Sequence, residues 1–420
     1  MARRTPRLSS LGALSALASV VLCAVLLAAC AANGPSNTSA LPAPSNQAPA
    51  EKTAPIKVAL LVPLSAQGHS GLIGKSLKQA AELALFERDN PSVQLIVKDD
   101  KGTPEGARAA AEEALKGGAK LILGPLFAKS VTTVAPLARQ ANVPVIAFSN
   151  DRHVAGNGVH LLSFQVEPEV ARVVAYAAQQ GKRRFVALVA DDALGKIAGA
   201  RFREAVSRAG GTVIALETYP MSANGMLEPM RKIAMLIRAA EEGGAPIDAL
   251  FIPGGQESLE TIGRLLPQAE IDTDKVRLIG TGGMDYPNAG RDAKLIGAWY
   301  PGPDPRGWND FAQKYAKSYG QAPPRIASLA YDAVTLAVAL SGGPEGQRYT
   351  AAQLTRASGF TGIDGTFRLL GDGSAERALA ILEVQKFGAG IVDAPQNLPS
   401  GPPPPATGIT SALSGLFNLN

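Results

Sequence analysis

The chain has 420 residues, of which 46% are hydrophobic and 18% charged, and its formal net charge is +5. This length is enough for more than one compact domain, and the small, dispersed charge argues against nucleic-acid binding. Both cysteines, Cys23 and Cys30, lie in the first thirty residues, which excludes a disulfide framework or a cysteine metal site in the rest of the chain.

The first thirty residues have the layout of a secretory signal peptide. Arg3, Arg4 and Arg7 are followed by an uncharged, Leu- and Ala-rich run over residues 8–29. Small residues precede Cys30, and this ending resembles the bacterial lipobox, in which the cysteine carries the lipid of the mature chain. A transmembrane anchor is the alternative. Removal of residues 1–29 leaves 38 basic and 36 acidic residues, a net charge of +2.

Two segments are too polar and Pro-rich to build a core. Residues 30–54, which start at the predicted lipidated Cys30, form a predicted disordered tether, and residues 391–420 form a predicted disordered tail. In lipoprotein families, Ala31 and Ala32 after the cysteine resemble an outer-membrane address. We therefore expect a periplasmic protein anchored by a lipid, with the outer membrane as the expected membrane.

Short β-branched and Leu-rich runs alternate with longer amphipathic segments between these ends. The predicted strands are Ile56–Val62, Val93–Val97, Lys120–Leu123, Val143–Phe148, Phe185–Val189, Val213–Leu216, Ala249–Ile252 and Val276–Ile279. The predicted helices include Leu72–Arg88, Glu105–Lys116, Glu169–Gln179, Ala198–Ala209 and Leu227–Ala240. This alternation predicts an α/β protein with two doubly wound parallel-sheet lobes, the first ending near Phe164.

Ligands of open parallel sheets bind at the carboxyl ends of the strands. The residues at those ends include Ser65, Gly124-Pro125, Ser149-Asn150-Asp151, Asp191-Asp192, Pro253-Gly254-Gly255 and Gly280–Gly283. The paired carboxylates Asp99-Asp100 and Asp191-Asp192 are more typical of caps and turns than of metal ligands. A Ser–His–Asp site built from residues distant in sequence stays open as an alternative. His153 near Ser149 and Asp151 is the least implausible such trio, and ligand contact or loop structure is the preferred interpretation of it. We expect no enzyme activity, no cofactor and no metal.

The chain resembles periplasmic solute-binding proteins of the leucine/isoleucine/valine-binding type over residues 56–390. The segments that carry the resemblance occur in order: Val58–Ser65 with Gly74, Lys98–Gly102, Ile122–Pro125, Val143–Ser149, Asp191–Gly195, Pro253–Gly255 and Ala330–Ala333. The resemblance implies the type 1 periplasmic binding fold, with two lobes joined by a hinge that the chain crosses three times. Lobe 1 would comprise residues 56–165 plus 300–345, and lobe 2 residues 166–299 plus 346–390.

The same resemblance implies ligand-binding positions in the cleft. In amino-acid-binding members, a serine and a small-small-Thr segment hold the α-carboxylate, and aromatic residues and a glutamate surround the ammonium. The corresponding positions here, with the first loop included, are Ser65, Gln67, Ser130, Ser149, Asn150, Asp151, Leu194, Gln256 and Gly282. Leu194 and Gln256 replace tyrosines and Gly282 replaces the glutamate, while Asp151 would repel a carboxylate. These departures argue against an ordinary α-amino acid.

A second resemblance is to lipid-anchored activators of penicillin-binding proteins. The shared segments are Phe148–Asp151, Thr281–Gly283 and Gly362–Phe367, with Gly373 and Arg377. It implies a non-catalytic regulator of peptidoglycan synthesis that contacts bifunctional penicillin-binding proteins, and this is the favoured hypothesis from sequence. The alternative is the substrate-binding subunit of an ABC importer, with an ABC permease as partner and an amino acid or another small polar solute as ligand.

Overall fold

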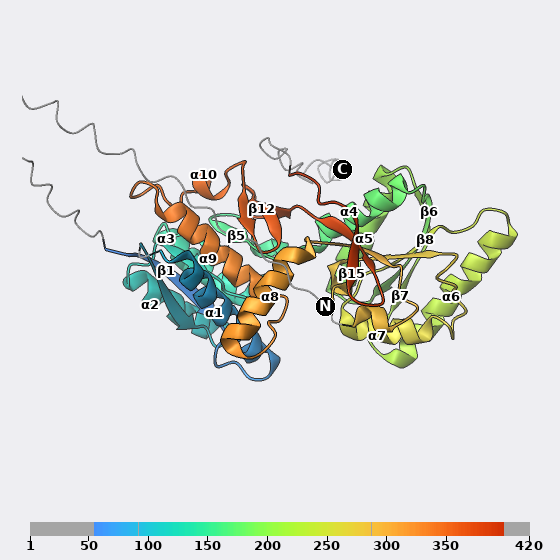
Figure 1. Ribbon diagram of the computed structural model, residues 1–420, viewed down its shortest axis with the longest axis horizontal. Helices are drawn as coiled ribbons and strands as arrows, with labels where there is room; N and C mark the ends of the chain where they lie inside the picture. The colour runs from blue at the N-terminus through green and yellow to red at the C-terminus, as the bar shows by residue number, and fades with distance from the viewer. Residues whose placement is uncertain (1–53, 91, 287, 399–420) are drawn as a thin grey trace, which may run out of the picture. The chain divides into compact units, whose positions relative to one another are not determined.

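The computed structural model describes residues 54–90, 92–286 and 288–398 (Figure 1). The predicted signal peptide, the lipidation site Cys30, the tether up to residue 53 and the tail from residue 399 lie outside the described residues. No described helix is long and apolar enough to cross a membrane.

The first sheet has parallel strands in the order β2-β1-β3-β4-β5. Residues Val58–Val62 of β1 are completely buried, because helices cover both faces of this strand and β2 and β3 cover its two edges. Val58, Leu60 and Val62 point into one apolar core, and Ala59 and Leu61 point into another. The strands are β1 (Ile56–Val62), β2 (Val93–Asp99), β3 (Leu121–Leu123), β4 (Val145–Ala147) and β5 (Val159–Leu161).

Helices from both halves of the chain cover this first sheet. One face carries α2 (Pro104–Lys116) and α3 (Ala128–Gln140), while the other carries α1 (His69–Arg88) and α9 (Ala327–Ser341). Helix α9 is buried nearly all round, which explains its run of apolar residues. The remaining elements here are η1 (Arg152–Val154), α8 (Pro305–Tyr319), α10 (Ala351–Leu354), and the antiparallel strands β11 (Phe360–Gly362), β12 (Gly365–Leu369) and β13 (Ala375–Arg377).

The second sheet is mixed, with the strand order β15-β14-β10-β9-β8-β6-β7. Its strands all run in one direction except β14, which pairs antiparallel with both of its neighbours, β10 and β15. The strands are β6 (Arg184–Ala190), β7 (Thr212–Tyr219), β8 (Ala249–Ile252), β9 (Arg277–Gly280), β10 (Trp299–Gly302), β14 (Ala380–Val384) and β15 (Ala389–Asp393). Its helices are α4 (Val166–Gln179), α5 (Ala193–Arg208), α6 (Ala223–Glu242), α7 (Gln256–Leu265), η2 (Gly282–Met284) and η3 (Ala289–Arg291).

The chain passes three times between the cores of the two sheets, but not at all the expected residues. Strand β10 belongs to the second sheet, although residues from 300 onward were expected in lobe 1. Tyr349, Phe360 and Phe367 pack in the first core, although residues 346–390 were expected in lobe 2. The expected boundaries are corrected at these points, because β11–β13 turn back toward α9 and only β14 and β15 join the second sheet.

The alternation of strands and helices predicted from sequence is confirmed. Strands β1 and β8 have the predicted bounds, and the other predicted strands differ by a few residues at their ends. The expected tail from residue 391 begins inside β15, so its first residues are paired in the sheet. Strand β5, a three-residue strand whose central residue is His160, was not predicted, because such a short segment gives no periodic signal.

Candidate ligand-binding cleft

A cleft of about 1150 Å³ lies where strand ends of both sheets face one another. The loops after β4, β6, β8, β9 and β10 all contribute to its lining, as expected for the carboxyl ends of parallel strands. The lining residues are Asn150–His153, Phe164, Val166, Glu167, Glu169, Ala193, Leu194, Ile197, Ala200, Arg201, Glu204, Pro253–Gly255, Thr281–Gly283, Asp285, Pro301–Pro303 and Arg325.

One wall of the cleft is apolar and comes mainly from the first turns of α5. Leu194 is 48% exposed and Ile197 is 40% exposed, so both side chains face the cleft rather than a core. Asp192 fixes the start of this helix, since its side chain accepts a hydrogen bond of 2.6 Å from the Gly195 N–H. Phe164 and Val166 add apolar surface from the linker into α4. This wall suits a ligand with an apolar body.

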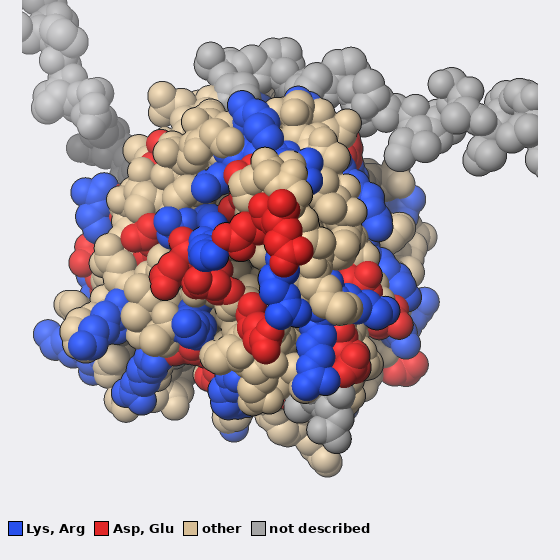
Figure 2. Space-filling view, turned by 90° about the vertical axis from the view of Figure 1, so that its right-hand side faces the viewer, with Lys and Arg blue, Asp and Glu red and all other residues tan. Residues whose placement is uncertain are grey.

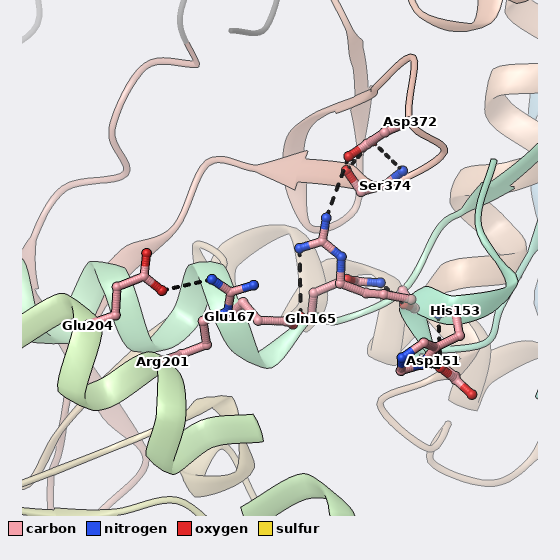
Figure 3. Close-up of polar contacts among 10 residues, drawn as sticks. Asp151, His153, Gln165, Glu167, Arg201, Glu204, Asp372 and Ser374 are labelled. Atoms are coloured by element: carbon pink, nitrogen blue, oxygen red, sulfur yellow. Dashed lines mark hydrogen bonds and ion pairs between the residues drawn. The ribbon is translucent and has the colours of Figure 1, made fainter. Parts of the chain in front are cut away.

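Two of the three arginines in the lining are paired along one side of the cleft. The Arg152 guanidinium lies 3.7 Å from Glu167 and 3.5 Å from Asp372, and so joins α4 to the loop between β12 and β13. The Arg201 guanidinium donates a 2.8 Å hydrogen bond to Glu204 on the same helix. Figure 3 shows these pairs side by side, with Ser374 bonded to Asp372. Neither guanidinium is therefore free to neutralise an anionic ligand.

Arg325, the third lining arginine, connects the two cores. Its guanidinium lies 3.3 Å from Asp285, which follows η2 in the second core, and it also pairs with the buried Asp364 of the first core. The guanidinium stacks over the ring of Trp308, with its carbon 4.4 Å from the ring centroid. These contacts raise the pKa of Arg325: burial alone would lower it, but the two carboxylates outweigh burial.

A buried charge cluster lies behind Arg325. Asp332 and Asp364 are both completely buried, and the Arg377 guanidinium lies 3.6 Å from Asp332. Burial, with the neighbouring Asp364 carboxylate, raises the pKa of Asp332, and Arg377 opposes this shift. The cluster brings together two segments that carry separate family resemblances in the sequence, Ala330–Ala333 and Gly362–Phe367. The charged residues of both segments therefore belong to a buried ion-pair network and not to the surface of the cleft.

Glu169 is half-buried on α4, and its carboxylate lies over Gly282. The Gly282 N–H donates a 2.9 Å hydrogen bond to Glu169 Oε2, across 113 residues of sequence. A Cβ atom at position 282 would lie 2.9 Å from Glu169 Oε1, so the carboxylate occupies the place of a side chain there. Burial, with the charge of Glu167, raises the pKa of Glu169 to about 7, although the Gly282 hydrogen bond opposes the shift.

The trio Ser149, Asp151 and His153 does not form a catalytic triad in this structure. His153 Nδ1 lies 2.8 Å from Asp151 Oδ1, but the His153 side chain is 90% exposed. Ser149 is buried, and its hydroxyl accepts a 3.2 Å hydrogen bond from the Asp151 N–H. Within the described residues, no hydrogen bond joins His153 to the Ser149 hydroxyl. Hydrogen bonds from the His153 N–H and ring lower the pKa of Asp151 and keep it ionised.

Four of the predicted ligand-binding residues line the cleft: Asn150, Asp151, Leu194 and Gly282. The other five lie outside the lining, namely Ser65, Gln67, Ser130, Ser149 and Gln256. Their role in binding stays a prediction.

Two of these five have clear local surroundings. Ser130 is buried in the first turn of α3, and its hydroxyl has no hydrogen-bond partner among the described residues. It is not the N-cap, which is Phe127. Gln256 bonds Glu260 on its own helix, at a distance of 2.9 Å.

The paired carboxylates are local turn and cap residues. Asp192 caps α5, and Asp99 accepts hydrogen bonds from the Ser65 and Lys101 N–H groups. Asp100 is buried and accepts one from the Gly102 N–H. Within the described ranges, no cluster of three or more His, Cys, Asp or Glu side chains could hold a metal ion.

Several residues of the cleft were not among the predicted site residues, including Glu169, Arg152, Arg201 and Arg325. Glu169 and Arg201 appeared as ordinary charges on amphipathic helices, where charge usually marks the solvent face. The one sequence signal for such a residue was Gly282, where the family glutamate is absent. The missing carboxylate could have prompted a search for a replacement carboxylate elsewhere in the chain.

Comparisons with known proteins agree with this geometry. Residues 55–389 match the periplasmic binding protein family. The Leu/Ile/Val-binding protein homolog 6 of Brucella melitensis is 25% identical over 216 residues, which cover 49% of this chain and 52% of the relative. The chain thus spans about half the length of the curated relatives it matches.

Solved structures are similar in fold over most of the chain. The solute-binding protein of an ABC transporter from Rhodopseudomonas palustris BisB5, in complex with a dihydroxybenzoic acid, is 20% identical with a TM-score of 0.58, covering 82% of this chain and 98% of its own. An ABC transporter substrate-binding protein from Desulfitobacterium hafniense, in complex with Leu, is 19% identical with a TM-score of 0.60, covering 80% and 99%. From the family match over residues 55–389 and from its two large α/β sheets, this chain belongs to the periplasmic binding protein family.

Proposed function

We propose that this chain is the substrate-binding subunit of an ABC importer for a small solute. The observation that carries the proposal is the cleft of about 1150 Å³ built from strand ends of both sheets. Membership of the periplasmic binding protein family supports it, and so do structural neighbours described as ABC transporter solute-binding proteins. The chain would bind its solute without catalysis and present it to a permease outside the cytoplasmic membrane.

Two further parts of the proposal concern the ends and the hinge. The lipid on Cys30 would hold the protein at a membrane surface, and the tether of residues 30–54 would give the binding unit reach. The two cores would act as lobes that close on the ligand by bending at the three chain crossings near residues 165, 303 and 378.

The regulator of peptidoglycan synthesis is less well supported. Part of its resemblance rests on Gly362–Phe367 and Arg377, but Asp364 and Phe367 are completely buried and the Arg377 side chain is 5% exposed. Residues at these positions serve the internal packing of the fold and offer little surface to a partner. Neither the Brucella relative nor the two structures reported above is described as an activator.

A ligand screen tests the proposal. The purified full chain is heated with a library of amino acids, amines, amides, organic acids and short peptides. A solute present at a hundredfold excess over its Kd should stabilise the folded state by about 2.7 kcal/mol, which raises Tm by several degrees. If no solute of the library changes Tm or gives heat in calorimetry, the importer proposal is wrong. Retention of penicillin-binding proteins by the immobilised chain would then favour the regulator instead.

A further inference from the structure

The lining of the cleft carries more negative than positive groups. It contains five carboxylates, those of Asp151, Glu167, Glu169, Glu204 and Asp285, against the three guanidinium groups of Arg152, Arg201 and Arg325. Each guanidinium already has a carboxylate partner within the described residues. Asp372 and Asp364, outside the lining, add a second carboxylate to two of them. An anionic ligand would find no unpaired cation here.

Glu169 is the exception among these carboxylates. In the described part of the chain it has no ion pair, and its one hydrogen bond comes from the Gly282 N–H. A half-buried carboxylate with one backbone partner retains acceptor capacity for a ligand. An ionised carboxylate in such a place is costly unless a cation neutralises it.

The cationic side chains on the elements around α4 do not pair with Glu169. On α5, Arg201 and Arg208 both pair with Glu204, and Lys196 pairs with Asp191. Arg203 lines a separate groove beside β7.

Two further pairs complete the surroundings of α4. Arg277 on β9 lies 3.8 Å from Glu383 on β14, and Arg172 on α4 itself pairs with Asp393. The free charge at Glu169 therefore faces the cleft without competition from a protein cation.

From this arrangement we propose that the cleft binds a solute with a protonated amine on an apolar body, the amine against Glu169 and the body against Leu194, Ile197 and Phe164. This inference deepens the proposed function and rests on it. The amine takes the place that a buried cation would otherwise fill, and the exposed apolar wall of α5 is covered when the ligand binds. A ligand recognised chiefly through a carboxylate would meet Asp151 and Glu169 instead of a cation.

Matched amines and acids of the same shape provide the test. Isothermal titration compares isoamylamine with isocaproate and phenethylamine with hydrocinnamate, using the full chain at pH 8. Each amine should bind at least about tenfold more tightly than its acid partner. Since burial raises the pKa of Glu169 to about 7, amine affinity should fall about tenfold between pH 8 and pH 6, as Glu169 becomes protonated. The amines themselves stay protonated over this range.

A variant assigns the effect to the residue. Glu169→Gln keeps an oxygen that accepts from the Gly282 N–H but removes the charge, and it should weaken amine binding at least about tenfold and abolish the pH dependence. The control Glu345→Gln removes an exposed carboxylate outside the cleft lining and should change neither. The pH profile of the unaltered chain tests the proposal even if the variant does not fold.

The outcomes separate this inference from the proposed function. If the acids bind as tightly as the amines, or if amine affinity is the same at pH 6 and pH 8, the amine inference is wrong and the importer proposal stands. The same holds if the amines do not bind while another solute of the library does. If neither these probes nor any solute of the library binds, both proposals fail.

Discussion

Gly283 shows how closely two backbone segments approach at the floor of the cleft. A Cβ atom at this position would lie 1.9 Å from the carbonyl oxygen of Gly254 and 2.8 Å from its carbonyl carbon. Backbone atoms cannot rotate away as the end of a flexible side chain can. The glycines after β8 and β9 are therefore required by the contact between two adjacent loops, and this contact shapes the cleft.

The substitution Gly283→Ala should lower the free energy of unfolding by about 1–3 kcal/mol, because the two loops must separate to accept the methyl group. Urea denaturation followed by circular dichroism measures the change. Gly342→Ala is the matched control, since a Cβ atom there meets nothing within 4 Å and the backbone is right-handed helical. Equal stabilities of the two variants would contradict the packing argument.

A carboxylate near Gly282 is supplied by a residue from another part of the chain. A comparison with the family position by position does not find it. The family resemblance predicts a glutamate at this position, and its absence alone suggests that the cleft lost a charge. In the structure, Glu169 supplies a carboxylate at the same place from a helix that is distant in sequence. The cleft therefore contains a carboxylate at this place, although position 282 itself does not supply it.

At the scale of elements, α5 is the helix that shapes the apolar wall. Its first turn carries Ala193 and Leu194 into the cleft, and its start depends on the hydrogen bond from the Gly195 N–H to Asp192. Asp and Asn are favoured at N-caps because their oxygen satisfies a free backbone N–H of the first turn. The carboxylate of Asp192 thus belongs to the helix and is not a free ligand in the cleft.

The substitution Asp192→Ala should destabilise the chain by about 1 kcal/mol, since the first turn of α5 loses its cap. Thermal unfolding at neutral pH measures this as a lowered Tm. Ser222→Ala is the control, because Ser222 is the N-cap of α6 without a side-chain hydrogen bond. A loss at Ser222→Ala as large as at Asp192→Ala would show that side-chain capping is not the cause.

The element pattern was predictable where a segment is long and periodic. Helices α1, α2, α4 and α6 and the central strands have amphipathic or continuous apolar sequences, so local physics decides them. The strands β10–β15 were not predicted, because they are short and several are only half-buried. Their partners come from distant parts of the chain, and no local pattern reveals such pairing.

At the scale of the whole binding unit, charged side chains connect the two cores across the cleft. Arg325 holds Asp285 of the second core while Asp364 anchors it in the first. Lysines and arginines alternate with acidic residues over the face shown in Figure 2, so the visible described surface of this face presents no extended field of one sign. If the two cores move as the proposed function requires, specific ion pairs rather than long-range attraction are expected to set the balance between open and closed arrangements.

The substitution Asp285→Asn should broaden the distribution of distances between the two cores, because it removes one cross-cleft pair and leaves Arg325 paired with Asp364. Spin labels at Glu105→Cys and Glu228→Cys, in a chain carrying Cys23→Ser and Cys30→Ser, report this distribution by pulsed electron resonance. Both label sites are exposed. Glu105 lies on α2 of the first core and Glu228 on α6 of the second core. The Arg325 and Asp285 side chains are 24% and 37% exposed, and this partial exposure limits the contribution of the pair to stability to about 1 kcal/mol or less.

A pair within one core is the control for this experiment. Glu241 pairs with Lys275 on the second core alone, so Glu241→Gln should leave the distance distribution unchanged. If the distance distribution of Asp285→Asn matches that of the unaltered chain, the pair between Arg325 and Asp285 does not restrain the two cores.

The sequence by itself determined the α/β alternation, the family and the place of the cleft. These follow from local apolar periodicity and from the rule that the carboxyl ends of parallel strands meet at one edge. Only the tertiary structure decided which charges are compensated. Whether Glu169 is free and Arg201 paired depends on atoms that the fold brings within a few ångströms, and sequence spacing does not encode those distances. The character of the proposed ligand follows from that pairing.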